Sequence, residues 1–470
     1  MIYKKVTFEI IGELIEILGA KNVIYNNFEV MEQYSHDEVA EKSYAHMPEV
    51  VVKPSTAKEI SKIVKFANKY KIPVTPRGAG SGLSGGAIPV NGGIVLSLEK
   101  MNKILEIDKK NLIAVVEPGV VTNDINNFVK DDGLFYAGYP MSVETCYIGG
   151  NVAENAGGGR AVKYGVTGRY ICGLEVVMPT GEILHLGGKR MKDVTGYDLI
   201  HLMVGSEGTL GIFTKIYIKL VPLPQANVSL LVLFKDIESA IKLVPKIMTF
   251  GRIVPTSIEF MDELSFKASC EYLNEKIPFK KAGAMLLIEL DGDSKKELEG
   301  QYEIIGNLCT ENGAIEVYVA DNATTSERIW KIRRNIAEAW KLISPHQSLE
   351  DVVVPISEIP KFLIKIKELS EKFDVSIPCY GHAGDGNLHP TLIKNPKIEM
   401  DEWYEKLDEL LPELYKTAVE LGGTISGEHG IGSKRNKYIS IPLEPAQIEV
   451  MKKIKKALDP NLILNPGKIF

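Results

Sequence analysis

The sequence has few cysteines, and none of them lie close together. Its 470 residues include five cysteines, scattered along the chain with no C-x-x-C spacing. This pattern argues against a disulfide scaffold and against an iron–sulfur cluster held by this chain alone. A reducing compartment, the cytoplasm, is therefore expected.

The sequence also lacks an excess of basic residues and any long apolar run. The formal net charge is -6, which excludes the strongly basic face that a nucleic-acid partner would need. No apolar run approaches the length of a membrane span. Hydrophobic residues make up 45% and charged residues 25%, which is ordinary for a soluble globular protein.

The first twenty residues are apolar enough to be mistaken for a signal peptide. Three glutamates interrupt this stretch, whereas the apolar core of a signal peptide carries no charge. Apolar residues fall instead at helical spacing, at Phe8, Ile11, Ile15 and Leu18. They predict an amphipathic helix.

A glycine-rich loop in the first third contains a G-x-G-x-x-G pattern, from Gly80 to Gly85. A helix over 57–70 and a strand over 72–76 are predicted before it, but the residues after it are typical of strands. A Rossmann fingerprint requires a helix there, so the pattern is not interpreted as one. The loop could still hold a phosphate through successive backbone N–H groups, with Arg77 adding charge. An ordinary glycine turn is the alternative.

Two further loops are rich in small residues, over residues 148–165 and 194–212. Three such loops in one strand-rich region indicate an extended, closely covered ligand rather than three unrelated turns. The proline-containing stretch 221–225 then predicts a domain boundary, because proline interrupts both helices and strand pairing.

Beyond this boundary the predicted elements alternate. Strands are expected over 228–234, 256–261, 284–290 and 315–320, and helices over 237–250 and 295–312. This order is β-α-β-β-α-β, the ferredoxin-like unit.

The stretch from Ile377 to Ile393 contains two histidines around a strong turn signal, Asp385-Gly386. A two-residue hairpin loop there would pair His382 with His389, close enough for both imidazoles to bind one metal ion. The alternative is a pair of structural histidines. A carboxylate should complete such a site, and Glu428 beside His429 supplies one.

A helix is predicted over residues 326–340, and it carries Arg333. A guanidinium suits a bidentate grip on a substrate carboxylate. The alternative is that Arg333 and Arg334 belong to a solvated basic face, and Lys331 and Arg334 are expected at the surface.

Several of these stretches together resemble a known family. They are residues 76–86, 149–158, 173–182, 192–211 and 465–469. They look like the FAD domain of the p-cresol methylhydroxylase type, and the chain resembles D-lactate dehydrogenases, glycolate oxidase flavin subunits and D-2-hydroxyglutarate dehydrogenases. The resemblance implies an α+β fold with such an FAD-binding domain and a ferredoxin-like substrate, or cap, domain.

The resemblance also implies a domain order and a noncovalently bound FAD. A helical segment is expected over 1–46, the FAD-binding domain over 47–225, the cap domain over 226–422, and a segment returning to the FAD domain over 423–470. The expected FAD-binding residues are Arg77, Gly78, Ala79, Gly80, Ser81, Gly82, Leu83, Ser84, Pro140, Gly150, Asn151, Asn155, Gly158, Tyr164, Gly165, Asp198, Glu207 and Asn465.

By motif, the resemblance assigns His382, His389 and Glu428 to a divalent metal ion (Zn, Fe or Mn). Related members carry a further Asn ligand two residues past the second histidine, where this chain has Thr391. His429 would be the base that removes the hydroxyl proton of a 2-hydroxy acid, and Arg333 would hold its carboxylate. The Cα hydrogen would leave as hydride to the flavin, giving the 2-oxo acid.

The expected substrate is D-lactate or glycolate, with electrons passed to a partner protein, either an electron-transfer flavoprotein or an iron–sulfur subunit. One alternative is a flavin oxidase or transferase of another class on the same fold. The paired histidines and Arg333 argue against it, because such reactions need no metal-bound hydroxy acid. The other alternative is a non-catalytic electron-relay subunit, and retention of every proposed active-site residue argues against that.

Overall fold

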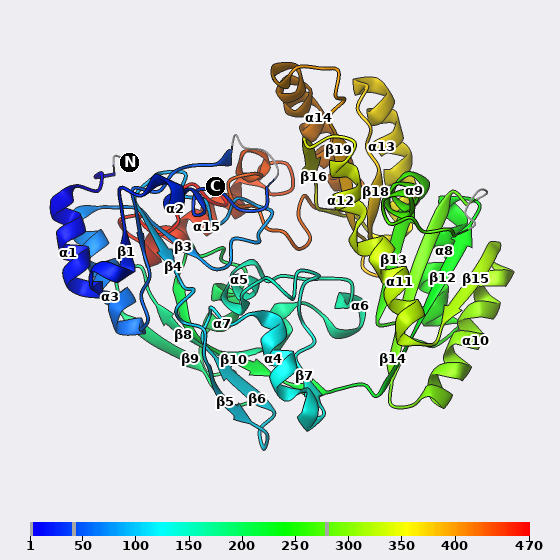
Figure 1. Cartoon of the computed structure of the whole chain (residues 1–470), viewed down its shortest axis with the longest axis horizontal. Coiled ribbons are helices and arrows are strands. Elements are labelled where there is room, and N and C mark those ends of the chain that lie inside the picture. Colours follow the sequence, from blue (N-terminus) through cyan, green and yellow to red (C-terminus); the bar gives the residue numbers. More distant parts are fainter. Residues whose placement is uncertain (1–2, 40–43, 278–281) are drawn as a thin grey trace. The chain divides into compact units, whose positions relative to one another are not determined.

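The computed structural model describes residues 3–39, 44–277 and 282–470 (Figure 1). The chain forms two compact units. The first comprises Met1–Gly157, Val166–Leu223 and Glu428–Phe470, and the second comprises Gly158–Gly165 and Pro224–Gly427. Each unit is therefore built from segments that are distant in the sequence.

Two main sheets form the first unit. The first has the strand order β1-β2-β4-β3, and its strands β2, β4 and β3 are parallel. The second is antiparallel and has the order β5-β6-β10-β8-β9. Strands β11 and β7 form a separate antiparallel pair. The strands are β1 (Val23–Ile24), β2 (Val50–Val52), β3 (Val74–Arg77), β4 (Ile94–Ser97), β5 (Ile104–Asp108), β6 (Ile113–Val116), β7 (Leu134–Phe135), β8 (Ile171–Val177), β9 (Ile183–Gly187), β10 (Ile212–Lys219) and β11 (Val221–Pro222).

The helices of the first unit include the predicted N-terminal one. They are α1 (Phe8–Leu18), α2 (Phe28–Glu32), α3 (Ala57–Tyr70), α4 (Thr122–Val129), α5 (Ile148–Glu154), α7 (Leu199–Met203) and α15 (Pro445–Leu458). The prediction of α1 is confirmed. Of its predicted apolar residues, Ile11 and Leu18 are buried and Ile15 packs against the core, whereas Phe8 is 75% exposed; Ile10 and Leu14 are also buried. The buried residues of α1 and α3 form one core with the β1-β2-β4-β3 sheet.

The glycine-rich loop follows β3 directly. Between β3 and β4 the chain makes bends and turns and no helix, which confirms that this is not a Rossmann turn. Gly80 and Gly85 have φ of 78° and 76°, a backbone conformation that residues with a Cβ rarely adopt.

The second unit contains the predicted ferredoxin-like order. Its sheet runs β15-β12-β14-β13-β18-β19-β16, and β17 also pairs with β19. The strands are β12 (Ala226–Phe234), β13 (Ser257–Asp262), β14 (Ala284–Gly292), β15 (Ala314–Ala320), β16 (Gln347–Leu349), β17 (Val352–Val353), β18 (Cys379–His382) and β19 (Asn387–Ile393). The first four strands, α8 and α10 follow the predicted order, but the chain forms an additional helix, α9, between β13 and β14 that was not predicted. Strand β18 extends the sheet beyond β13.

The helices of the second unit are α6 (Ala161–Tyr164), α8 (Ile237–Thr249), α9 (Glu263–Tyr272), α10 (Lys295–Glu311), α11 (Ala323–Arg334), α12 (Ile336–Lys341), α13 (Ile359–Phe373) and α14 (Met400–Glu420). The helix expected over 326–340 is two helices, because the chain leaves helical geometry at Asn335, whose side-chain amide donates to the Lys331 carbonyl. Apolar residues of β12, such as Leu231, pack with Phe266 of α9 and Ile332 of α11 in one core.

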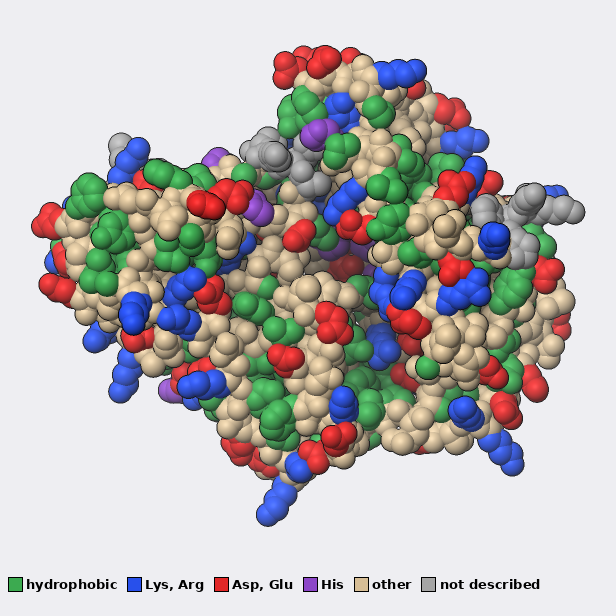
Figure 2. All heavy atoms as spheres, viewed as in Figure 1, with side chains coloured by type: hydrophobic (Ala, Val, Ile, Leu, Met, Phe, Trp, Pro, Cys, Tyr) green, Lys and Arg blue, Asp and Glu red, His purple; other side chains and the backbone are tan. Residues whose placement is uncertain are grey.

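Charged side chains of both signs are interspersed over the face of the protein drawn in Figure 2. Within the part of the chain that the structure describes, no helix combines the length and the apolar character needed to cross a membrane.

Candidate active site

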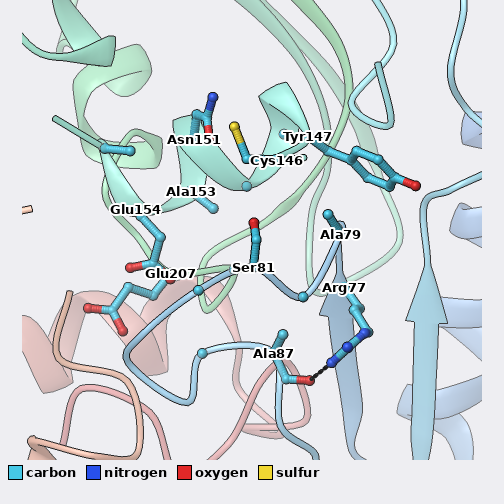
Figure 3. A pocket seen from close by; sticks show the side chains of 18 of the residues that line it. Arg77, Ala79, Ser81, Ala87, Cys146, Tyr147, Asn151, Ala153, Glu154 and Glu207 are labelled. Carbon is cyan, nitrogen blue, oxygen red and sulfur yellow. Dashed lines mark hydrogen bonds between the residues drawn. The ribbon is translucent and has the colours of Figure 1, made fainter. Parts of the chain in front are cut away.

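A cavity in the first unit is lined by the three loops that the sequence singled out (Figure 3). Its lining residues come from 76–87, from 140–157 around α5, and from 207–213, with further contributions from Leu98, Pro118, Glu428 and His429. The first stretch is mostly glycine, alanine and serine, so this part of the cavity wall is largely backbone. Such a wall presents N–H groups at close range to a bound anion.

The loop of residues 77–87 is held in place by hydrogen bonds of two buried side chains, Arg77 and Asp37. Arg77 is buried, and its guanidinium donates to the carbonyls of His36 at 2.7 Å, Gln33 at 3.0 Å and Ala87 at 3.5 Å. Burial lowers the pKa of Arg77. Asp37, which sequence reasoning missed, accepts from the Gly85 N–H at 2.8 Å. These contacts of Arg77 and Asp37 order the loop.

Asp37 makes the stability of the first unit depend on pH. Burial raises the pKa of Asp37 from 3.8 to about 6. Between these values the folded state binds more protons at Asp37 than the unfolded state, so this residue lowers stability as the pH rises from about 4 to about 6.

The Asp37→Asn variant removes this titration. We expect it to gain about 3 kcal/mol relative to the parent between pH 4 and pH 7. Thermal unfolding of both proteins across this pH range measures the gain. A difference in melting temperature that did not change with pH would contradict the expectation.

Two carboxylates lie in the cavity wall, those of Glu207, which is buried, and Glu154, which is partly buried. Glu207 accepts from the backbone N–H groups of Ile431 and Gly432 at 2.8 and 2.6 Å. Burial, and next the charge of Glu207, raise the pKa of Glu154, and burial also raises the pKa of Glu207. Glu207 therefore anchors the chain directly after His429. Glu154 was not predicted, although a lone carboxylate in a loop of small residues was a usable signal.

The predicted FAD-binding residues divide into two groups. Those that line the cavity are Arg77, Gly78, Ala79, Gly80, Ser81, Gly82, Leu83, Pro140, Gly150, Asn151 and Glu207. The cavity lining does not include Ser84, Asn155, Gly158, Tyr164, Gly165, Asp198 and Asn465.

Several residues of the second group have other contacts. The Asn465 amide donates to the carbonyls of Gly86 and Glu207 at 3.0 and 2.7 Å, behind the loops. Asp198 caps the exposed helix α7 by accepting from His201 N–H at 3.0 Å. Tyr164 donates to Asp291 at 2.8 Å within the second unit. Lining residues that were not predicted include Cys146 and Tyr147, which directly precede α5.

The histidine hairpin of the second unit has a different register from the predicted one. His382 pairs with Asn387, and His389 pairs with Tyr380. The predicted two-residue loop was wrong, because four residues connect the strands and the Gly386 N–H closes this turn onto the His382 carbonyl at 3.0 Å. A shift by two residues keeps each side chain on its face of the sheet. The two imidazole rings therefore still meet, with centroids 5.3 Å apart.

The predicted carboxylate-binding arginine is buried near this hairpin. Arg333 is 5% exposed and its guanidinium lies over the ring of Tyr380, with 4.8 Å between its central carbon and the ring centroid. The alternative of a solvated basic face is therefore wrong for Arg333. For Arg334 it holds, since that side chain is 39% exposed and pairs with Glu327 on the surface.

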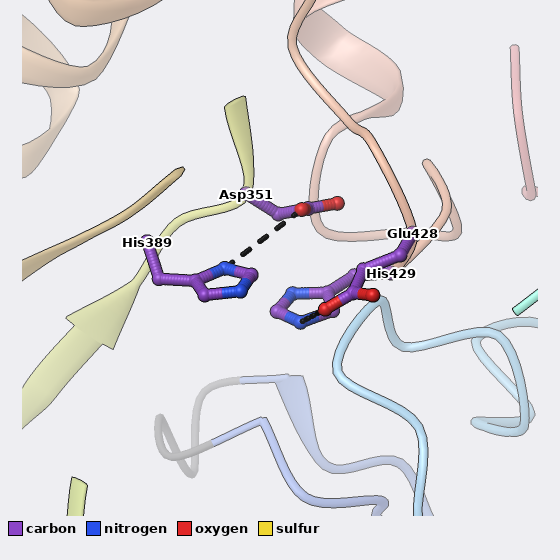
Figure 4. Close-up of side chains that lie close together, drawn as sticks. All are labelled: Asp351, His389, Glu428 and His429. Carbon is purple, nitrogen blue, oxygen red and sulfur yellow. Dashed lines mark ion pairs between the residues drawn. The ribbon is translucent and has the colours of Figure 1, made fainter. Parts of the chain in front are cut away.

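A buried aspartate organises the end of the second unit's chain (Figure 4). Asp351 accepts from the side chains of Asn387 and Ser426, both at 2.7 Å, and from the Gly427 N–H at 2.9 Å. Its carboxylate also lies 3.9 Å from Nδ1 of His389. The chain is thus fixed up to the residue that precedes Glu428.

Glu428 and His429 begin the last segment of the first unit. The Oε1 atom of Glu428 lies 3.9 Å from Nε2 of His429, and both side chains are mostly buried. Both residues line the cavity described above.

The residues present fit a flavin dinucleotide. The Cβ atom that a substitution at Gly82 would add meets only Asp37, at 3.7 Å, and one at Gly150 meets nothing within 4 Å. These glycines therefore leave open space inside the cavity, where backbone can approach a ligand. Within the second unit, the neighbouring imidazoles of His382 and His389 offer nitrogen donors of the kind that divalent transition metals bind.

Comparison with known proteins supports an FAD-binding domain. Residues 48–187 match the family described as "FAD binding domain", and residues 223–469 match "FAD linked oxidases, C-terminal domain". The chain is 41% identical to glycolate oxidase subunit GlcD of Bacillus subtilis (strain 168) over 99% of this chain and 97% of that protein. It is 40% identical to D-lactate dehydrogenase of Anaerostipes hadrus over 99% of this chain and 98% of that protein.

A solved structure of p-cresol methylhydroxylase with substrate bound superimposes with a TM-score of 0.82 at 20% identity, covering 100% of this chain and 98% of that one. This likeness confirms the expected α+β fold with its FAD-binding domain. The chain therefore belongs to the FAD-linked oxidase family, as an FAD-dependent oxidoreductase of the D-lactate and glycolate dehydrogenase type.

Proposed function

We propose that the protein oxidises a small D-2-hydroxy acid, D-lactate or glycolate, to the 2-oxo acid and passes the electrons to a partner protein. The observation that carries this proposal is the buried Arg333 in the same unit as the two neighbouring imidazoles. A buried cation suits a substrate carboxylate, and the imidazoles suit a metal ion beside the hydroxyl group. The names of the relatives, a glycolate oxidase subunit and a D-lactate dehydrogenase, support the same substrate class.

The roles proposed for the chain's residues follow from these positions. Arg333 binds the carboxylate and so orients the substrate. His382, His389 and Glu428 hold the metal, and Asp351 fixes the backbone directly before Glu428. His429 accepts the hydroxyl proton. When bound, FAD supplies the acceptor for the hydride that leaves Cα, and the metal supplies a Lewis acid for the hydroxyl group.

Reduction of the flavin by substrate under anaerobic conditions tests this function directly. D-lactate or glycolate is expected to bleach the flavin absorbance, and L-lactate is the stereochemical control. Turnover with an artificial electron acceptor then separates catalysis from transfer to the natural partner. Absence of bleaching by every D-2-hydroxy acid, in a protein with full FAD content, would contradict the proposal.

The cavity assignment has its own test at Gly82. A Gly82→Val side chain has room in the protein itself, because the added Cβ meets only Asp37 at 3.7 Å. We therefore expect normal folding but much weaker FAD binding, since the side chain occupies the space of the ligand. The FAD-to-protein ratio after purification is the measurement.

Gly306→Ala is a suitable control for this variant. Gly306 lies in α10 of the second unit, and a Cβ there meets nothing within 4 Å. An unchanged FAD content in Gly82→Val would place the cofactor elsewhere.

A further inference from the structure

Another buried carboxylate of the second unit lies beside the proposed substrate and metal residues. Glu259 is on β13 and is completely buried. The antiparallel pairing of β13 with β18 places it directly opposite His382. Neither the sequence motifs nor the roles proposed above include it.

Glu259 contacts two of those residues through separate oxygens. Its Oε1 atom lies 2.7 Å from Nδ1 of His382. Its Oε2 atom lies 2.8 Å from Nη2 of Arg333, as an ion pair without hydrogen-bond alignment. One carboxylate therefore joins the proposed metal ligand to the proposed carboxylate clamp.

The backbone at Gly159 packs directly against the carboxylate of Glu259. A Cβ added at Gly159 would overlap Oε1 of Glu259, so this glycine permits the chain to lie directly on the carboxylate. Burial raises the pKa of Glu259, but the charges of His382 and Arg333 outweigh this effect and leave its pKa below the usual range. The carboxylate of Glu259 is therefore held in place by Gly159, His382 and Arg333.

We propose that Glu259 is a positioning residue that sets the tautomer of His382 and the direction of Arg333. A carboxylate on Nδ1 fixes the proton there, so that only Nε2 of His382 can bind a metal. The other oxygen holds the guanidinium over Tyr380 and keeps it from turning. This role rests on the proposed function, because it concerns the residues that the function uses.

Substitution by glutamine separates the two contacts. If the amide oxygen of Glu259→Gln accepts from His382, its NH₂ group faces the Arg333 guanidinium, and two donors meet. If the amide is reversed, it donates to Nδ1 and leaves the proton of His382 on Nε2, where the metal should bind. Either orientation misplaces one of the two groups, and the loss of the negative charge weakens the contact with the other. Glu259→Asp keeps the charge but shortens the reach.

The experiment begins with the parent protein. Metal-stripped protein is titrated with Zn²⁺ or Mn²⁺ against a competing chelator, and KM and kcat for D-lactate and glycolate are measured. If the parent holds no metal or oxidises no D-2-hydroxy acid, the proposed function fails, and the role of Glu259 fails with it.

For Glu259→Gln we expect metal affinity about 10- to 100-fold below that of the parent, as is usual when the partner of a metal-ligating histidine is lost. When metal is added to saturation, kcat should return toward the parent value. KM should stay raised, because Arg333 remains misdirected. FAD content should stay at the parent level, since the cavity is in the first unit. A role in stability alone would lower the melting temperature without this separation of KM from kcat.

Glu289→Gln is the matched control. Glu289 is another buried carboxylate of the same sheet, on β14, and lies 3.6 Å from Arg160. Parent-like metal affinity and KM in Glu259→Gln, or equal changes in Glu289→Gln, would overturn the proposal even if the parent is active.

Discussion

The His429→Asn variant is expected to reduce its flavin about a hundred to ten thousand times more slowly than the parent when substrate is added. That range is typical for the loss of a general base. His429 and its neighbour Glu428 both line the first unit's cavity, and in the proposed mechanism Glu428 would bind the metal while His429 would accept the proton. A nearby cation would disfavour the imidazolium and keep the base unprotonated near neutral pH.

Asparagine retains some hydrogen bonding at this position but cannot accept the hydroxyl proton. Stopped-flow spectroscopy of flavin reduction isolates the step, because it excludes transfer to the electron acceptor. FAD and metal contents should match the parent. Flavin reduction at the parent rate would assign the base to another residue and refute the central step of the mechanism.

The His382→Ala variant is expected to lose its metal and to turn over about a thousandfold or more slowly, while FAD remains bound. A Lewis acid at the hydroxyl group contributes several kcal/mol to such a reaction. The side chain is buried in the second unit and contacts Glu259, so its loss does not reach the cavity of the first unit. Elemental analysis and turnover with an artificial acceptor measure the two effects together.

His185→Ala is the control for this variant. His185 is on β9 and 70% exposed, so it should retain parent-like metal content and activity. Full activity of His382→Ala in protein shown to be free of metal would remove the metal from the mechanism.

Local signals were sufficient for most of the second unit. The strands and helices of the ferredoxin-like order were predicted from hydrophobic runs and periodicity, because each element is long and packs along its whole length. The hairpin register was not, since Asp385-Gly386 is a strong local signal but the turn that forms is four residues long. The hydrogen bond from the Gly386 N–H to the His382 carbonyl closes this turn. The pairing of β18 with both β13 and β19 fixes where the turn forms.

The contacts of Arg333, Glu259 and Asp351 could not be read from the sequence. Glu259 is 123 residues from His382 in the chain, and no spacing rule joins them. Only the pairing of β13 with β18 brings these side chains together.

By itself, the sequence determined where the loops of small residues lie, because runs of small residues and turn signals are local properties of the chain, and its longer motifs carried the resemblance that indicated the family. The tertiary structure decided which of those residues line the cavity and which hydrogen-bond to the loops without lining it. Asn465 and Asp37 hold the glycine-rich loop without lining the cavity. The physical reason is that these buried groups bond to segments far away in the sequence, 48 residues for Asp37 and 379 for Asn465, and only the packed fold brings them within reach.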